Sequence, residues 1–312
     1  MKLSCPSVHH RLKTFAALFL ILATLGCSAT NALVQKAQTP AAAATDSQAK
    51  PGESTLQPTR TPESSAGGTV APNPQPVGVA GERSIGDPYA PELGNTGYDV
   101  QMYTLRFAID PAEINLAAHA TIEALSTLAN LGQISLDFTG FDIGQLTVNG
   151  APAQYSREGD KLIVNFAAPL DQGEAFTLDV EYSGAPTFTT SEYLPFVDHL
   201  GLFFNTDTQR VFALSEPDGA HYWFPCNDHP RDKATYRFEL TVPEEMTGLA
   251  NGRLIETHTE VPNALPSGKA GDQFIWEHDF PMASYLATIG IGEYVLIKGT
   301  SPQGIPLRSY AY

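Results

Sequence analysis

The chain has 312 residues and a formal net charge of −16, with 34 acidic and 18 basic residues. Because 30 of the acidic residues but only 11 of the basic ones lie beyond Ser84, nucleic acid and anionic lipid surfaces are poor electrostatic partners for that part of the chain. Of the three cysteines only Cys226 lies beyond residue 27, which excludes a disulfide within the remaining chain. Its stability must come from a hydrophobic core.

The first 27 residues have the pattern of an export signal. Three basic residues precede the apolar run FAALFLILATLG at 15–26, which is shorter than the roughly 20 residues of a transmembrane helix. The run ends at TLGC, which resembles a bacterial lipoprotein cleavage site with Cys27 as the lipidated residue. We therefore predict a lipoprotein-type signal peptide over 1–27 and an exported protein, periplasmic or at the cell surface, held at the membrane by a lipid anchor. The alternative is an ordinary secretory signal cleaved within 28–32, which would release the protein.

Residues 28–84 are predicted to be a disordered linker. They consist mainly of Ala, Pro, Ser, Thr and Gly, with few large apolar residues. Such a segment cannot bury enough surface to offset the entropy lost on ordering. Its prolines favour extended conformations, so it would act as a spacer between the membrane anchor and a folded body.

Residues 85–312 are predicted to form an all-β body. Short segments alternate apolar and polar residues with a period of two, and Gly, Pro, Asn or Asp bound them. Asn149-Gly150 predicts a tight hairpin turn, and 156–161 predicts another. No window shows a sustained helical stripe, so we expect an antiparallel, multi-stranded sandwich or saddle-shaped sheet pair. The expected strands begin at Tyr98, Asn115, Gln133, Gln145, Lys161, Phe176, Ala234, Gln273 and Glu293.

The segment 215–235, SEPDGAHYWFPCNDHPRDKAT, gathers reactive side chains without strand or helix periodicity. It leads into a strand in which Tyr236, Phe238, Leu240 and Val242 alternate with polar residues and should face the core. A loop that a rigid scaffold holds in this way is a common place for binding residues.

Complete catalytic machinery is not predicted in this chain. The loop has neither a His-Glu-x-x-His nor a Cys-x-x-Cys pattern, so no metal site is expected. Cys226 lacks a helix start that would lower its pKa and is expected to be a small buried side chain. Ser215 lacks the Gly-x-Ser-x-Gly context of a nucleophile. The metal-ligand types considered are His221, Cys226, Asp228, His229 and Asp232.

The same loop resembles the signature of the amino-terminal β-domain of the aminopeptidase N family, the zinc metallo-aminopeptidases. The resemblance extends over about 85–312, including the opening stretch 87–103. The matching elements are Glu216-Pro217, Phe224-Pro225-Cys226, Asp228-His229-Pro230, Lys233-Ala234-Thr235 and the ANGRL stretch at 250–254.

The resemblance implies that this chain is one part of an enzyme that releases amino-terminal residues from peptides. In that family zinc is held in a following catalytic domain, whose motifs this chain lacks, so the chain alone is expected to bind no zinc and to be inactive. The acid of the acid-Pro pair, here Glu216, would bind the free α-ammonium of the substrate. Many members carry glutamine two residues earlier, whereas this chain has Leu214, which either lines the first pocket with an apolar side chain or weakens polar recognition.

The rest of the loop is expected to be structural. Trp223 and Phe224 would anchor it on the β-core or on the catalytic domain, and Asp228, Asp232 and Lys233 would form a polar lock at the seam between the domains. The final residues, PLRSYAY, have the pattern of a strand in progress, so we expect the parent protein to continue.

A different class of function stays open from sequence. The chain could be a non-catalytic surface lipoprotein, a β-sandwich that binds carbohydrate or peptide on an aromatic platform. Tyr193, Phe196, Tyr222 and Trp223 are the candidates for that platform. A downstream helical His-Glu-x-x-His region would favour the enzyme, and a stop codon after Tyr312 would favour the binding protein.

Overall fold

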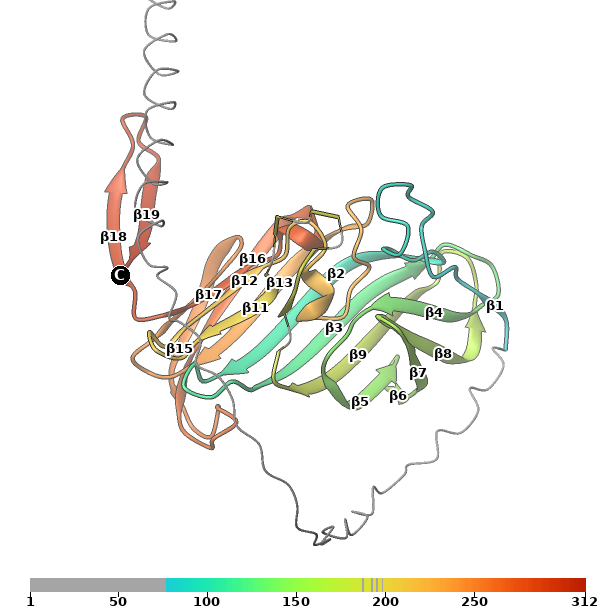
Figure 1. Ribbon diagram of the computed structural model, residues 1–312, viewed down its shortest axis with the longest axis horizontal. Helices are drawn as coiled ribbons and strands as arrows, with labels where there is room; N and C mark the ends of the chain where they lie inside the picture. The colour runs from blue at the N-terminus through green and yellow to red at the C-terminus, as the bar shows by residue number, and fades with distance from the viewer. Residues whose placement is uncertain (1–76, 187, 192, 195, 198) are drawn as a thin grey trace, which may run out of the picture. The chain divides into compact units, whose positions relative to one another are not determined.

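The computed structural model describes residues 77–312, except 187, 192, 195 and 198. The predicted signal peptide with Cys27, and the linker up to residue 76, lie outside the described residues. The described part is built from strands, with two short 3-10 helices, η1 (Ala220–Tyr222) and η2 (Ser284–Leu286) (Figure 1). None of its helices is long and apolar enough to cross a membrane. The predicted all-β class is confirmed.

An eight-stranded sheet forms the centre of the body (Figure 1). Its neighbouring strands are antiparallel except β13 and β2, which pair in parallel from Thr235 with Met102 to Thr241 with Ala108. The sheet is therefore mixed rather than wholly antiparallel as expected, because β13 pairs with β2 only after the chain has passed through the four-stranded sheet and β10 to β12 of the five-stranded sheet. The strand order is β15 (Arg253–Val261), β16 (Gly271–Ala283), β13 (Lys233–Val242), β2 (Tyr98–Ile109), β3 (Leu116–Ser126), β9 (Ala175–Gly184), β5 (Asp142–Val148) and β6 (Ala151–Pro152).

Three smaller sheets complete the described part. The four-stranded sheet has the order β1 (Val79–Ala80), β4 (Leu131–Asp137), β8 (Lys161–Leu170) and β7 (Gln154–Glu158). The five-stranded sheet has the order β10 (Phe188–Thr189), β11 (Leu200–Asn205), β12 (Arg210–Leu214), β17 (Ile289–Gly292) and β14 (Thr247–Ala250). β18 (Val295–Thr300) and β19 (Pro306–Ala311) form a separate hairpin.

Strand pairing is already present before Ile85, the start predicted for the folded part. Val79 pairs with Leu131 and Ala80 with Gln133, which adds β1 to the edge of the four-stranded sheet. The backbone N–H of Gly81 also donates to the carbonyl of Gln133, at 2.9 Å. The last residues of the predicted linker are thus part of a sheet, although their small side chains bury little apolar surface.

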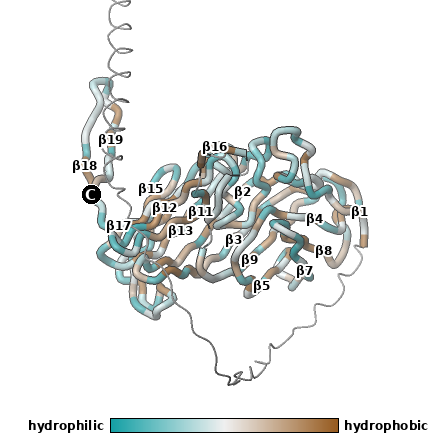
Figure 2. The backbone as a smooth tube through the Cα atoms, viewed as in Figure 1, coloured by the Kyte–Doolittle hydropathy of each residue, from teal (hydrophilic) through white to brown (hydrophobic). Residues whose placement is uncertain are grey.

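The core lies against one face of the eight-stranded sheet. The predicted inward residues of β13, Tyr236, Phe238, Leu240 and Val242, are at most 1% exposed, which confirms that face assignment. The rings of Phe166 in β8 and Phe176 in β9 lie 5.2 Å apart and join the four-stranded sheet to the central one. Figure 2 shows the hydrophobic residues along the strands, with hydrophilic residues more frequent in the connections.

Both predicted hairpin turns are present. Asn149 and Gly150 have positive φ angles of 50° and 76°, and Val148 pairs with Ala151 across them. Glu158 pairs with Lys161 across the second turn. The second turn matters for the site described below, because it places Lys161 at the start of a buried strand.

Candidate functional site

The loop 215–232 connects β12 to β13 and is tied to the four-stranded sheet by backbone contacts. Asp137, at the end of β4, and Cys226 exchange two backbone hydrogen bonds, of 2.8 and 3.0 Å. The N–H of Thr139 donates to the carbonyl of His221, at 3.1 Å. The middle of the loop is therefore held like an additional short strand beside β4.

Two aromatic side chains anchor the loop in the core of this chain. Trp223 and Phe224 are both fully buried; Trp223 packs 5.4 Å from Phe107, and Phe224 packs edge-on against Tyr103. The indole N–H of Trp223 donates to the hydroxyl of Ser215, at 2.9 Å. Since Trp223 is not at the surface, it cannot belong to the aromatic platform considered from sequence.

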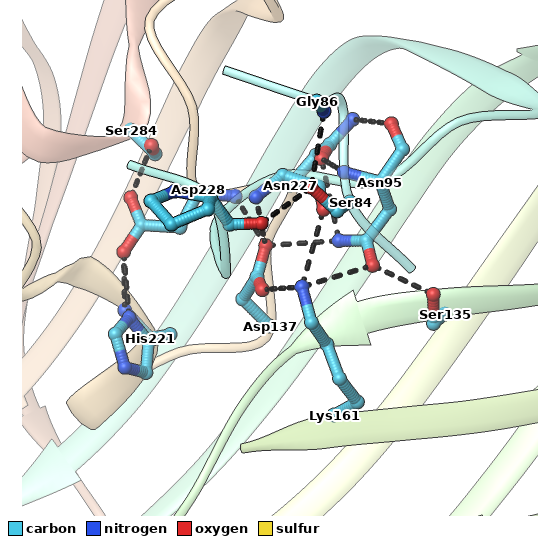
Figure 3. A network of polar contacts seen from close by, with 12 residues as sticks. Ser84, Gly86, Asn95, Ser135, Asp137, Lys161, His221, Asn227, Asp228 and Ser284 are labelled. Carbon is cyan, nitrogen blue, oxygen red and sulfur yellow. Dashed lines mark hydrogen bonds and ion pairs between the residues drawn. The ribbon is translucent and has the colours of Figure 1, made fainter. Parts of the chain in front are cut away.

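A buried carboxylate, Asp137, organises one end of the loop (Figure 3). Its Oδ1 accepts from the ammonium of Lys161, at 2.5 Å, and its Oδ2 accepts from the side-chain amide of Asn95 and the backbone N–H of Asp228, each at 2.9 Å. Burial raises the pKa of Asp137, and the positive charge of Lys161 opposes that rise. Burying this carboxylate costs free energy, and the hydrogen bonds from its several donors offset that cost.

Asn227 closes the same network from the loop side. Its Oδ1 accepts from the backbone N–H of Asn95, at 2.7 Å, and its own N–H donates to the phenol oxygen of Tyr103, at 3.0 Å. Its Nδ2 donates to Asp232 Oδ2, at 2.6 Å. Asn95 and the loop are thus joined by amide hydrogen bonds and not by charge alone.

Asp228 links the loop to η2. Its Oδ2 lies 2.8 Å from Nδ1 of His221, and its Oδ1 accepts from the hydroxyl of Ser284, at 2.7 Å (Figure 3). Burial alone would lower the pKa of His221, but the hydrogen bond and charge of Asp228 raise it overall. The carboxylate of Asp228 therefore lies between Ser284 and His221 and fixes the position of the loop. Because Ser284 contacts the carboxylate and not the imidazole, the three residues do not place a nucleophile next to a base.

Asp232 is another acid of the loop that the protein largely covers. Its Oδ1 accepts from the backbone N–H of Val100, at 3.2 Å, in addition to the contact with Asn227. Desolvation raises the pKa of Asp232 to about 7, although both hydrogen bonds oppose the rise. The neighbouring Lys233 is exposed. Asp228 and Asp232 therefore have partners within this chain, and their predicted place at a seam between domains stays a prediction.

Glu216 is placed differently from these acids. It follows β12 and is exposed, and its peptide bond with Pro217 is cis. No residue in the described part of the chain forms a hydrogen bond or an ion pair with its carboxylate. Glu216 is thus an acid on a well-anchored loop whose charge is available to an external partner.

The donor arrangement does not fit a metal ion. Within residues 77–312, the masked positions apart, no three His, Cys, Asp or Glu side chains gather as a potential metal site. Of the five ligand types considered from sequence, His221, Asp228 and Asp232 are hydrogen-bonded to one another or to neighbours, and Nε2 of His229 lies 3.1 Å from Asp87. Cys226 is free and fully buried, as predicted, and burial raises the pKa of its thiol well above the usual range.

Sequence reasoning missed several members of the network: Asn95, Asp137, Lys161, Asn227 and Ser284. The sequence indicates only that Asp137 ends one apolar strand and that Lys161 begins another. A charged residue at a strand end is as often exposed to solvent as buried in a network. Asp137 and Lys161 meet through the pairing of β4 with β8, where they lie opposite each other.

The comparison with known proteins agrees with the loop's signature. Residues 99–286 match the peptidase M1 N-terminal domain family. The chain belongs to that family. The match covers the eight-stranded sheet from β2 to β16 and the whole loop, and it ends before the β18–β19 hairpin.

Individual relatives support the same assignment. Aminopeptidase N of Acetobacter pasteurianus is 24% identical over 212 residues, which is 67% of this chain and 56% of that protein. Glutamyl aminopeptidase of Rattus norvegicus is 33% identical over 104 residues, or 33% of this chain and 10% of that protein. An M1 zinc metallopeptidase of Deinococcus radiodurans has a similar solved structure, with a TM-score of 0.62 and 26% identity over 73% of this chain and 50% of that one. The chain thus spans half of that solved structure and a small part of the rat protein.

Proposed function

We propose that this chain is the amino-terminal part of an exported zinc aminopeptidase that removes amino-terminal residues from peptides. The observation that supports this most directly is the free, exposed carboxylate of Glu216 on a loop that is otherwise fixed by buried contacts. The family assignment gives the reaction class: the related solved protein is named a zinc metallopeptidase, and a variant of it was solved with a Tyr-Ser-Ala substrate.

Glu216 suits the recognition of a peptide's amino end. An enzyme that removes the first residue must recognise the α-ammonium, because that charge is the unique mark of the chain end. A carboxylate that loses water when the substrate binds can form a charge-assisted hydrogen bond worth about 1.5–3 kcal/mol. An N-acylated peptide would leave Glu216 without its charge partner, and the cost of that loss would exclude such peptides.

The zinc ion in this proposal is held by residues of a catalytic domain outside this chain. When bound there, it would polarise the scissile carbonyl and activate water. The part of the chain described here supplies the amine-binding carboxylate and a docking surface for that domain. Exposed apolar side chains, among them Phe212, Leu214 and Leu286, are consistent with such a surface. The export signal and lipid anchor at Cys27 would place the enzyme outside the cytoplasm.

The proposal is tested on the intact zinc-loaded protein with aminoacyl anilides and their N-acetyl counterparts. Glu216→Ala should lower kcat/KM for free-amine substrates by about 10- to 150-fold, mainly through KM, because the lost hydrogen bond holds the substrate. Glu245→Ala is the matched control, since Glu245 is another exposed acid in a turn. Unchanged kinetics in Glu216→Ala would remove this residue from the site, and an intact protein without aminopeptidase activity would contradict the proposal as a whole.

A further inference from the structure

Glu216 lies in a tight turn whose two ends are buried. Ser215, directly before it, and Asp218, after the proline, are each 3% exposed, whereas Glu216 is exposed. The backbone N–H of Gly219 donates to the carbonyl of Ser215, at 2.7 Å, which closes the turn. The position of Glu216 therefore depends on the contacts that hold these two ends.

A tryptophan holds the first end of the turn. The indole N–H of Trp223 donates to the hydroxyl oxygen of Ser215, at 2.9 Å. Trp223 is itself fixed, because it is fully buried and its ring packs against Phe107 of β2 and edge-on against Phe224. A side chain of the core thus fixes the residue directly before Glu216.

A second buried hydrogen bond holds the other end of the turn. The hydroxyl of Ser191 donates to Oδ1 of Asp218, at 2.7 Å, and Ser191 is also 3% exposed. At Gly219 there is no room for a side chain, because an added Cβ would lie 2.9 Å from the carbonyl oxygen of Leu214 and 3.0 Å from Cβ of Leu200. The turn is therefore packed closely against the end of β12 and the start of β11.

These contacts matter because the carboxylate of Glu216 does not fix its own position. It forms no hydrogen bond or ion pair with the described part of the chain. A carboxylate that recognises an ammonium binds it more tightly when its backbone is placed before the ligand arrives, because ordering the backbone during binding costs free energy. The hydrogen bond from Trp223 supplies that placement at the neighbouring residue.

We propose that Trp223 is a positioning residue for the amine anchor: its indole N–H, through Ser215, holds the turn in the conformation in which Glu216 meets the substrate. This inference rests on the proposed function, because it takes Glu216 as the residue that binds the α-ammonium. The positioning role belongs to the N–H and is separate from the packing of the indole ring in the core.

The test separates the position of Glu216 from the stability of the fold. Trp223→Phe keeps an aromatic ring but removes the donor, and Ser215→Ala removes the acceptor. Each single variant leaves one buried polar group without a partner, whereas the double variant leaves neither, so the double variant should lose less stability to urea than the two single losses added together.

The kinetics of the intact zinc-loaded protein with a leucine anilide should not follow that recovery of stability. KM should rise about three- to tenfold in each single variant and stay raised in the double variant, with a smaller change in kcat, because the turn is no longer held in place. In a Glu216→Ala background Trp223→Phe should raise KM no further, since the group that it positions is gone.

Trp276→Phe is the matched control. Trp276 is the other tryptophan of the chain; it is buried, and its indole N–H donates to the carbonyl of Gly248, at 3.0 Å. That hydrogen bond joins β16 to β14 and does not involve the turn of Glu216. Trp276→Phe should therefore lower stability in the same way and leave KM unchanged.

The inference and the proposed function fail in different ways. If Glu216→Ala raises KM while Trp223→Phe and Ser215→Ala keep the wild-type KM, the inference about Trp223 is overturned and the amine anchor stands. If Glu216→Ala has no effect, the proposed role of Glu216 fails and the inference fails with it. An equal rise of KM in Trp276→Phe, or a KM that returns to the wild-type value in the double variant, would also overturn the inference, because the effect would then follow stability alone.

Discussion

Removing the ammonium of Lys161 should destabilise the domain strongly. Its Nζ donates to Asp137 Oδ1, to the carbonyl of Gly94 at 3.1 Å and to Asn95 Oδ1 at 3.3 Å. The side chains of Lys161 and Asp137 are only 12% and 2% exposed. In Lys161→Met the apolar stem is kept, but Asp137 Oδ1 loses its charged donor. Leaving one member of a buried pair without its partner costs about 3–5 kcal/mol.

Urea unfolding of the purified chain at pH 7, followed by circular dichroism, measures this cost. Lys298→Met is the matched control; Lys298 is exposed on β18, and its replacement should change the free energy of unfolding by less than about 0.5 kcal/mol. The double variant Asp137→Asn with Lys161→Met should lose at least about 1 kcal/mol less than the two single losses added together. A loss below about 1 kcal/mol in Lys161→Met, or full additivity in the double variant, would refute the claim that Lys161 offsets the cost of burying Asp137.

Two further outcomes follow from the buried groups of the loop. Because the pKa of Asp232 is about 7 in the folded protein and about 3.9 in an unfolded chain, the folded state keeps a proton that the unfolded state loses. Protonated Asp232 therefore stabilises the fold at low pH, and this contribution to the free energy of unfolding is lost as the pH rises from about 4 to 7. The loss is about 1.4 kcal/mol per pH unit in the middle of that range. Urea titrations across this range should show that contribution disappear in Asp232→Asn but persist in Asp207→Asn, which changes an exposed turn residue; equal pH dependence in both would contradict it. Cys226 should resist a thiol-specific reagent in the native protein and react once urea unfolds it, because it is buried and its thiol pKa is raised. Rapid native labelling would show that the loop opens readily.

The strands could be predicted where one face is buried and the other is solvated. β13 is an example, since its alternating residues specify both the strand and its inward face. β11 and β17 were not predicted, because Gly201 in β11 and Gly290 and Gly292 in β17 interrupt their apolar pattern. The parallel pairing of β13 with β2 could not be predicted from sequence either. It depends on the path of the chain between the two strands and not on the residues of either strand.

The loop shows a similar division. Its importance was evident from the density of reactive side chains and from the Phe-Pro-Cys stretch, and Cys226 is buried as expected. The network that fixes it was not predicted, because Asn95, Asp137 and Lys161 come from distant segments and are joined only by the tertiary fold. Sequence also could not show which aromatics are covered. Phe196 is 79% exposed, whereas Trp223 is fully buried, although both are large rings in irregular segments.

The acids around this loop are either buried and hydrogen-bonded or exposed and without a partner in the described part of the chain. This difference allows an effect on catalysis to be separated from an effect on folding. Asp137 and Asp228 are buried and accept several hydrogen bonds, so replacing either one would change folding and activity together. Glu216 is exposed and has no partner within the described part of the chain, so its removal should leave the free energy of unfolding nearly unchanged. A kinetic defect in Glu216→Ala with normal stability can therefore be attributed to the loss of a substrate contact.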